Sequence, residues 1–146
     1  MNRMIAKIVC TVGLLFIAIG LPALEISPTH VFNPNWPPHA LFHEVWQLLT
    51  DAAIAVLALY LTWTRDDVRL ASLIGLAVMG GAVAALALGN SYGGAITYEG
   101  GPALAVLGVP AAVLIPVVLA GGFVLTAFAA VPSRSSASEQ SGTTED

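Results

Sequence analysis

Charged residues are scarce in this chain. Only 10% of its 146 residues are Asp, Glu, Lys or Arg, whereas a water-soluble domain usually has about a quarter. Hydrophobic residues account for 57% of the chain, and the mean hydropathy is +0.83. This shortage of charge excludes an ordinary soluble globule, and the length suits a single domain. We therefore expect an integral membrane protein.

Cations and cysteine are scarcer still. The five Lys and Arg residues form no basic patch in the sequence, so nucleic-acid binding has no electrostatic support and no nucleic-acid partner is expected. Cys10 is the only cysteine, which excludes an internal disulfide. We expect this thiol to be a small, inert apolar group inside the first hydrophobic run.

Four apolar runs are each long enough to cross a bilayer. About 20 helical residues span the hydrocarbon layer, and a spanning segment must be helical because lipid offers no partner for unpaired backbone groups. The sequence thus predicts an all-α fold, a four-transmembrane-helix bundle with a proline-rich extracytoplasmic loop, within residues 1–131. The expected spans are residues 4–24, 45–64, 70–89 and 103–130.

The cations predict the direction of these spans. With four crossings, Arg3, Lys7, Arg65, Arg69 and Arg134 all fall on one side, and the loops on the other side have no cation. By the positive-inside rule both termini are cytoplasmic, in what we expect to be the plasma membrane. The alternative is that the first run is a cleavable signal peptide, which would remove one helix and leave the outer loop on the same side.

Small residues recur four apart in the third run. Such rows favour close helix packing, either within the chain or in a homodimer through this helix. In the fourth run, Pro110 and Pro116 are each expected to bend the helix. Residues 132–146 are polar and serine-rich, which predicts a disordered cytoplasmic tail. The rows of small residues are Ala71–Gly75, Gly80–Ala84 and Gly81–Ala85–Gly89.

The polar and aromatic chemistry is concentrated in residues 30–51, HVFNPNWPPHALFHEVWQLLTD, which include all three histidines. The prolines predict a stiff loop up to Trp36 and a second helix that begins near Pro37. At 100° per residue, the polar side chains of that helix share one face about 140° wide. These residues are His39, His43, Glu44, Gln47, Thr50 and Asp51.

Asp51 lies in the apolar part of that helix, where an unpaired carboxylate is costly. Two interpretations stay open: a protonated Asp51 held between helices, or a polar pocket open to the outside. We expect the pocket because histidines accompany the carboxylate, and Asn90, Ser91, Thr97 and Tyr98 of the second outer loop are candidates to approach it. The expected pocket residues are His30, Trp36, Phe42, Glu44, Gln47 and Asp51.

The histidines admit three interpretations. His39 and His43 are four apart on one helical face, a spacing that suits two ligands of a divalent ion such as zinc. His30, Glu44 or Asp51 could complete the site, and His30 is the expected third ligand. Acid–base chemistry with Asp51 or Glu44 is the second interpretation. The third is structural, with histidines that tie the loop to the helix through hydrogen bonds.

The string HVFNPNWPPHALFH, residues 30–43, resembles the H-x-F-N-P-x-W-P-P-H-A-x-F-H motif of a family of small, mostly uncharacterised membrane proteins from bacteria and fungi. There the motif leads from the first outer loop into the second helix, so the resemblance implies the same topology here. In span count and early polar groups, the chain is also similar to the four-helix superfamily of sterol isomerases and the sigma-2 receptor. That similarity implies a sterol-like ligand beside acidic and histidine groups.

The sequence therefore predicts a membrane protein that binds a metal ion or a small apolar ligand in an outward-facing pocket, in contact with membrane lipid. A non-catalytic accessory subunit of a membrane complex is one alternative. An isomerase-like enzyme acting on a lipid is another. The pattern assigns no catalytic residue and leaves enzymatic activity open.

Overall fold

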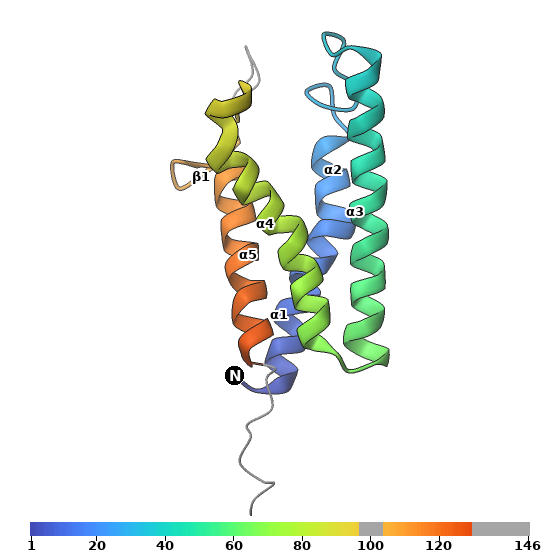
Figure 1. The fold of residues 1–146 in the computed structure, drawn as a ribbon, viewed down its shortest axis with the longest axis vertical. Helices are drawn as coiled ribbons and strands as arrows, with labels where there is room; N and C mark the ends of the chain where they lie inside the picture. The colour runs from blue at the N-terminus through green and yellow to red at the C-terminus, as the bar shows by residue number, and fades with distance from the viewer. Residues whose placement is uncertain (97–103, 130–146) are drawn as a thin grey trace, which may run out of the picture.

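The computed structural model describes residues 1–96 and 104–129, and it is mostly helical (Figure 1). Four of its helices are long and apolar enough to cross a membrane, as the sequence predicts. The first span is one continuous helix in three segments. The elements are α1 Arg3–Leu15, the π-helical η1 Phe16–Gly20, α2 Leu21–Glu25, α3 Pro38–Thr64, α4 Val68–Tyr92, β1 Ala105–Val106, β2 Val109–Pro110 and α5 Ala111–Ala129.

The π-helical segment η1 ends at Gly20, two residues before Pro22 in the first span. A proline removes one backbone donor and its ring crowds the carbonyl four residues earlier. The wider π turn accommodates both effects without ending the helix. As a result the helix continues to Glu25, which places this carboxylate at the end of the span.

The fourth span begins later than the expected residue 103. Residues 105–110 form a two-stranded antiparallel hairpin, in which Val106 pairs with Val109. Leu107 and Gly108 both have positive φ, at 53° and 79°, as a type I′ turn requires. Pro110 therefore ends a strand and bends no helix, whereas Pro116 lies inside α5 as expected.

The four long helices converge at one end of the bundle and separate at the other (Figure 1). We call the converging end, with the start of α1 and the α3–α4 turn, the closed end. We call the other end, with residues 30–43, the motif end. The buried core includes Leu14 and Ile17 of the first span, Ala55 and Ala58 of α3, Ala71 and Met79 of α4, and Phe123 of α5.

The described cations lie at the closed end, on the α1 start and around the α3–α4 turn. Arg3 and Lys7 both form ion pairs with Asp66 of this turn, and the Lys7 Nζ–Asp66 Oδ1 distance is 2.6 Å. Asp67 caps α4, because its side chain accepts a hydrogen bond from the Leu70 backbone N–H at 3.0 Å. The predicted grouping of Arg3, Lys7, Arg65 and Arg69 is therefore present, whereas Arg134 and the predicted tail lie outside the described residues.

Buried hydroxyl and thiol groups join all four spans near the closed end. Ser72 of α4 lies 2.7 Å, oxygen to oxygen, from Thr126 of α5. The Ser72 hydroxyl also donates to the sulfur of Cys10 in α1 at 3.5 Å, and that sulfur lies 3.9 Å from the Thr62 hydroxyl of α3. Each span thus contributes one residue to a single polar network, which we call the four-helix network. Cys10 is part of this network, so it is more than the apolar filler expected from the sequence.

Candidate functional site

A large cavity lies at the motif end, between the first span and α3 on one side and α4 and α5 on the other. Its volume is about 1740 Å³. Pockets for drug-sized ligands measure roughly 300–1,000 Å³, so this space suits a longer molecule. Figure 1 shows why it forms here, because the α4–α5 pair diverges from α2 and α3 toward this end.

The polar side chains that line the cavity all lie on one wall, which we call the polar wall. They come from the end of α2, the loop that follows and the first turns of α3, and the same wall also has the apolar Phe16, Leu21, Leu24, Leu48, Ile54 and Leu57. The carboxylates on it come from three places: Glu25 ends the first span, Glu44 lies in the second turn of α3, and Asp51 lies about two turns deeper. The remaining polar residues on this wall are Thr29, His30, Asn35 and Gln47.

The opposite wall is apolar. The described residues of α4 and α5 that line the cavity have no side chain with a polar atom. Part of the space comes from small residues, since a Cβ added at Gly81 would meet no atom within 4 Å. These lining residues are Ile74, Ala77, Val78, Met79, Gly81, Ala82 and Ala85 of α4 and Ala111, Ala112, Ile115 and Pro116 of α5.

The small-residue rows of α4 thus divide between two roles. Ala71 and Gly75 are buried inside the bundle, which agrees with packing within the chain. Gly81 and Ala85 instead line the cavity. A homodimer through this helix stays a prediction.

His30 is held beside Glu25 at the mouth of the polar wall. Its Nδ1 lies 3.0 Å from Glu25 Oε2 and 3.0 Å from the Thr29 hydroxyl. The imidazole also meets the Trp36 ring edge-on, with 5.7 Å between ring centroids. Glu25 Oε2 is buried and has no well-aligned hydrogen bond to any described residue. The contact with the His30 imidazole is therefore the one that offsets the cost of burying this oxygen.

Asn33 explains how the loop keeps this arrangement. Its side chain is only 1% exposed. The amide nitrogen donates to the Thr29 carbonyl at 3.0 Å, and its oxygen accepts from the Asn35 backbone N–H at 2.9 Å. These bonds are the Asn-based turn that an Asn-Pro pair favours. They fix the loop between His30 and Trp36, both of which line the cavity.

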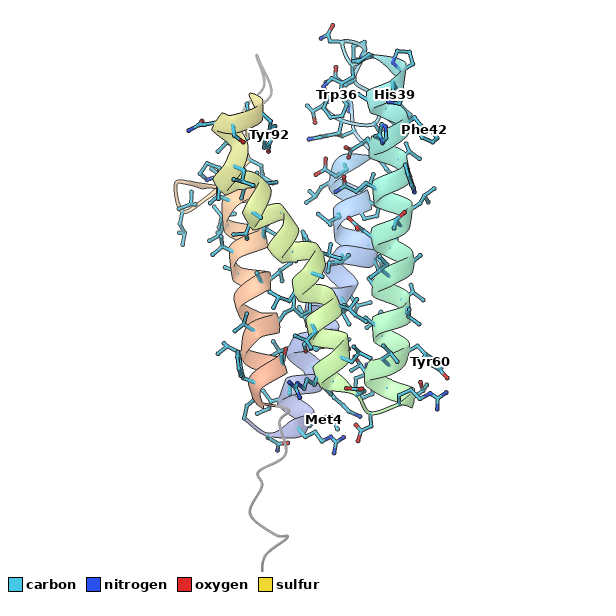
Figure 2. All side chains as sticks on the ribbon, in the orientation of Figure 1. Met4, Trp36, His39, Phe42, Tyr60 and Tyr92 are labelled. Atoms are coloured by element: carbon cyan, nitrogen blue, oxygen red, sulfur yellow. The ribbon has the colours of Figure 1, made fainter. Side chains whose placement is uncertain are left out.

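Five of the six expected pocket residues line this cavity: His30, Trp36, Glu44, Gln47 and Asp51. The sixth, Phe42, is not among the lining residues: it is 61% exposed and packs against His43 and Trp46. Phe42 precedes Asp51 by nine residues, about two and a half helical turns, and so it points to the opposite face of α3. Figure 2 shows His39 and Phe42 in the first turns of α3 and Trp36 in the loop just before it.

The three histidines are not brought together. His39 and His43 contact each other, with their Nε2 atoms 3.1 Å apart, whereas His30 is paired with Glu25. Across residues 1–96 and 104–129, no group of three or more His, Cys, Asp or Glu side chains could hold a metal ion. The structure therefore does not bring the expected ligands His30, His39 and His43 together at one point.

A smaller hollow of about 280 Å³ lies next to the large cavity on α3 and shares Gln47 and Asp51 with it. It is lined by His43, Trp46, Gln47, Thr50 and Asp51. The polar face of this helix is therefore divided, since Glu44 faces the large cavity, His43 the small hollow, and Asp51 borders both.

Sequence reasoning missed Glu25. The predicted span ends at residue 24, so Glu25 falls outside it, and its only signal in the sequence is a lone carboxylate after an apolar stretch, five residues before His30. From the second outer loop, Ala95 and Ile96 line the cavity, while Asn90 and Ser91 are exposed and do not. Thr97 and Tyr98 lie outside the described residues.

These features define a membrane protein with four spans and a cavity that has one polar and one apolar wall. The chain belongs to a family of unknown function (DUF6640), whose sequence pattern matches residues 8–133. The matched range includes all the residues that line the cavity. No curated protein and no solved structure matches the chain.

Proposed function

We propose that this protein binds an elongated, amphipathic, lipid-like molecule in the cavity at the motif end. One observation carries this proposal: a wall with three carboxylates faces a wholly apolar wall across a single space of about 1740 Å³. Apolar surface is removed from water when a chain packs against α4 and α5. The head group then meets the polar wall on α2, the loop and α3.

The charge of the polar wall selects the head group. It has Glu25, Glu44 and Asp51, and no Lys or Arg is among the described lining residues. An anionic head group would meet like charges, which costs several kcal/mol when they are placed side by side. We therefore propose a ligand with a neutral or cationic head group. A sterol-like alcohol satisfies this requirement.

The cavity also bears on the two alternative functions. A pure docking role predicts histidines bonded to backbone carbonyls and no cavity. In the described structure the His30 ring instead contacts the side chains of Thr29 and Glu25, and the His39 and His43 rings contact each other. An isomerase-like activity keeps one observation in its favour, because the Glu25–His30 pair lies beside the proposed ligand. If the bound lipid is converted, product will appear in lipid extracted after incubation, and His30→Gln will prevent it.

The binding proposal is tested with Trp36 as a reporter inside the cavity. In a Trp46→Phe/Trp63→Phe background, Trp36 is the sole tryptophan. The probes are dodecyl chains brominated beside the head group, prepared as the alcohol, the amine and the carboxylate, because bromine quenches tryptophan emission on contact. We expect saturable quenching in nanodiscs by the alcohol and the amine, with the carboxylate at least about tenfold weaker.

Two leucine substitutions provide the control. Gly81 lines the cavity and Gly121 lies exposed on α5, and a Cβ at either would meet no atom within 4 Å. Gly81→Leu projects a side chain from the apolar wall into the cavity and should weaken the saturable quenching, whereas Gly121→Leu should preserve it. Quenching that only follows probe partition into the bilayer, and that both variants share, would refute binding in the cavity.

A further inference from the structure

His39 and His43 lie outside the cavity, on the exposed face of α3 at the motif end. Both rings are exposed. They meet edge-on with 4.5 Å between centroids. The exposed Phe42 and Trp46 border the pair, and the His43 ring stacks on Trp46 at 5.8 Å. None of the four residues lines the large cavity, so the proposed lipid-like ligand leaves this pair unexplained.

The separation of the two ring nitrogens points to something held between them. Their Nε2 atoms are 3.1 Å apart, and two bare lone pairs repel at that distance. Either a proton or a metal ion must lie between them. Two nitrogens bound to one tetrahedral zinc ion, each at 2.0–2.1 Å, are about 3.3 Å apart. Hence the pair is already spaced for chelation.

Two ligands leave a tetrahedral ion half coordinated, and the described part of this chain supplies no third. We propose that His39 and His43 form half of a transition-metal site that the same pair of a second copy completes. Imidazole nitrogen is a ligand that zinc, copper and nickel all accept. The occupant is therefore one divalent ion per two chains.

The membrane makes this pairing of copies geometrically simple. Copies in one bilayer share depth and orientation, so a two-fold axis along the membrane normal brings identical faces together at the same height. Such an interface is isologous, with the same residues on both sides. His39 and His43 are on an exposed face of α3, so the pairs meet across the axis. Phe42 and Trp46 then cover the ion from lipid and water.

The test measures zinc content and mass together. Protein freed of any affinity tag is loaded with Zn²⁺, desalted, and analysed by elemental analysis and by size exclusion with light scattering. We expect one zinc per two chains and a dimer that EDTA converts to monomer. The His39→Ala/His43→Ala variant should bind no zinc and stay monomeric. His30→Ala removes the histidine outside the pair and should keep both zinc and dimer.

Three results would overturn the proposal. Absence of zinc in the wild type would leave a simple His–His hydrogen bond. One zinc on a monomer would exclude the shared site. A dimer that persists in the double variant would place the interface elsewhere, for example on the small-residue rows of α4. Gly81→Leu acts on the cavity and leaves the histidine pair unchanged. If this variant loses lipid binding but still binds zinc, the two sites are shown to be independent.

Discussion

Phe123 occupies a space that two glycines leave open. The ring is 1% exposed. A Cβ added at Gly13 would lie 2.6 Å from its Cζ atom, and one at Gly75 would lie 2.4 Å from it. Real contacts do not approach so closely, and a ring buried on all sides has no room to swing away. The glycines therefore allow α1, α4 and α5 to close around one aromatic side chain.

Gly75→Ala should destabilise the bundle. Overpacking of a filled core costs about 1–3 kcal/mol, so we expect the free energy of unfolding to fall by that amount. Thermal unfolding in non-ionic detergent, followed by circular dichroism, measures it. The control is Gly81→Ala, where the new methyl group meets nothing within 4 Å. Equal stability of the two variants would contradict this account of Phe123.

At the residue scale, the sequence predicts which side chains share a face of a helix, because helical periodicity alone determines this. The 100° rule correctly placed Glu44, Gln47 and Asp51 on one side of α3. Phe42 was grouped with the pocket for its place in the motif, whereas the same rule turns it to the face opposite Asp51, nine residues away. Glu25 was out of reach, since its position depends on a helix that continues through Pro22.

At the scale of elements, the turn between α3 and α4 is joined to the start of α1. Asp66 lies between α3 and α4 with φ of 55°, a left-handed conformation that Asp tolerates better than most residues. Its carboxylate meets Arg3 and Lys7 of α1. Arg3 also donates to the Asp66 carbonyl at 2.9 Å. The α3–α4 turn and the start of α1 are thereby joined by charge.

This link should weaken in acid. The hydrogen bond from Lys7, together with the charges of Arg3 and Lys7, holds the pKa of Asp66 below its ordinary value of 3.8. A depressed pKa in the folded state stabilises the protein above the unfolded value and is lost as the pH falls through the folded value. We expect Asp66→Asn to lower the thermal midpoint at pH 7, and the difference from wild type to shrink below about pH 4.

The matched control is Asp67→Asn. Asn caps a helix as well as Asp does, so the bond to Leu70 N–H survives and the midpoint should change little. Asn also tolerates the left-handed conformation at position 66, which isolates the charge in the test. A midpoint difference for Asp66→Asn that is the same at pH 7 and pH 3 would show that the charge of Asp66 contributes nothing.

The elements themselves were largely predictable, because lipid forces each apolar run into a helix. The exception is the start of α5. Apolar content marks residues 103–110 as part of the span, yet Leu107 and Gly108 form a turn, and Leu107 is 98% exposed. Hydropathy cannot separate a short apolar hairpin from a helix, and Leu is an unusual residue at positive φ.

At the scale of the whole molecule, the two ends of the bundle have different tasks. The closed end is held by the ion pairs of Asp66, the Phe123 contact and the four-helix network. The motif end is separated by the cavity. The sequence predicted a polar pocket but not its depth or its apolar wall, because those depend on how far α4 and α5 diverge from the first two spans. Stability and binding should therefore respond to different substitutions.

Ser72→Ala tests this separation. It removes the contact with Thr126 and the hydrogen bond to Cys10. Hydrogen bonds between membrane helices are worth about 0.6 kcal/mol on average and up to about 1.7. We expect unfolding to become easier by about 1 kcal/mol, while quenching of Trp36 by the brominated amine stays at the wild-type level. Ser91→Ala is the control, since the Ser91 hydroxyl bonds only locally, to the Leu88 carbonyl at 2.7 Å on an exposed turn.

Gly81→Leu should give the reverse pattern, with binding weakened and the unfolding midpoint preserved. It places a side chain in the cavity and leaves the four-helix network intact. The two variants together decide whether the closed end acts as a scaffold for an independent site. If Ser72→Ala weakens binding as much as it weakens the fold, the ends are coupled. The cavity would then depend on the packing of the entire bundle, and the contacts at the closed end would determine its width.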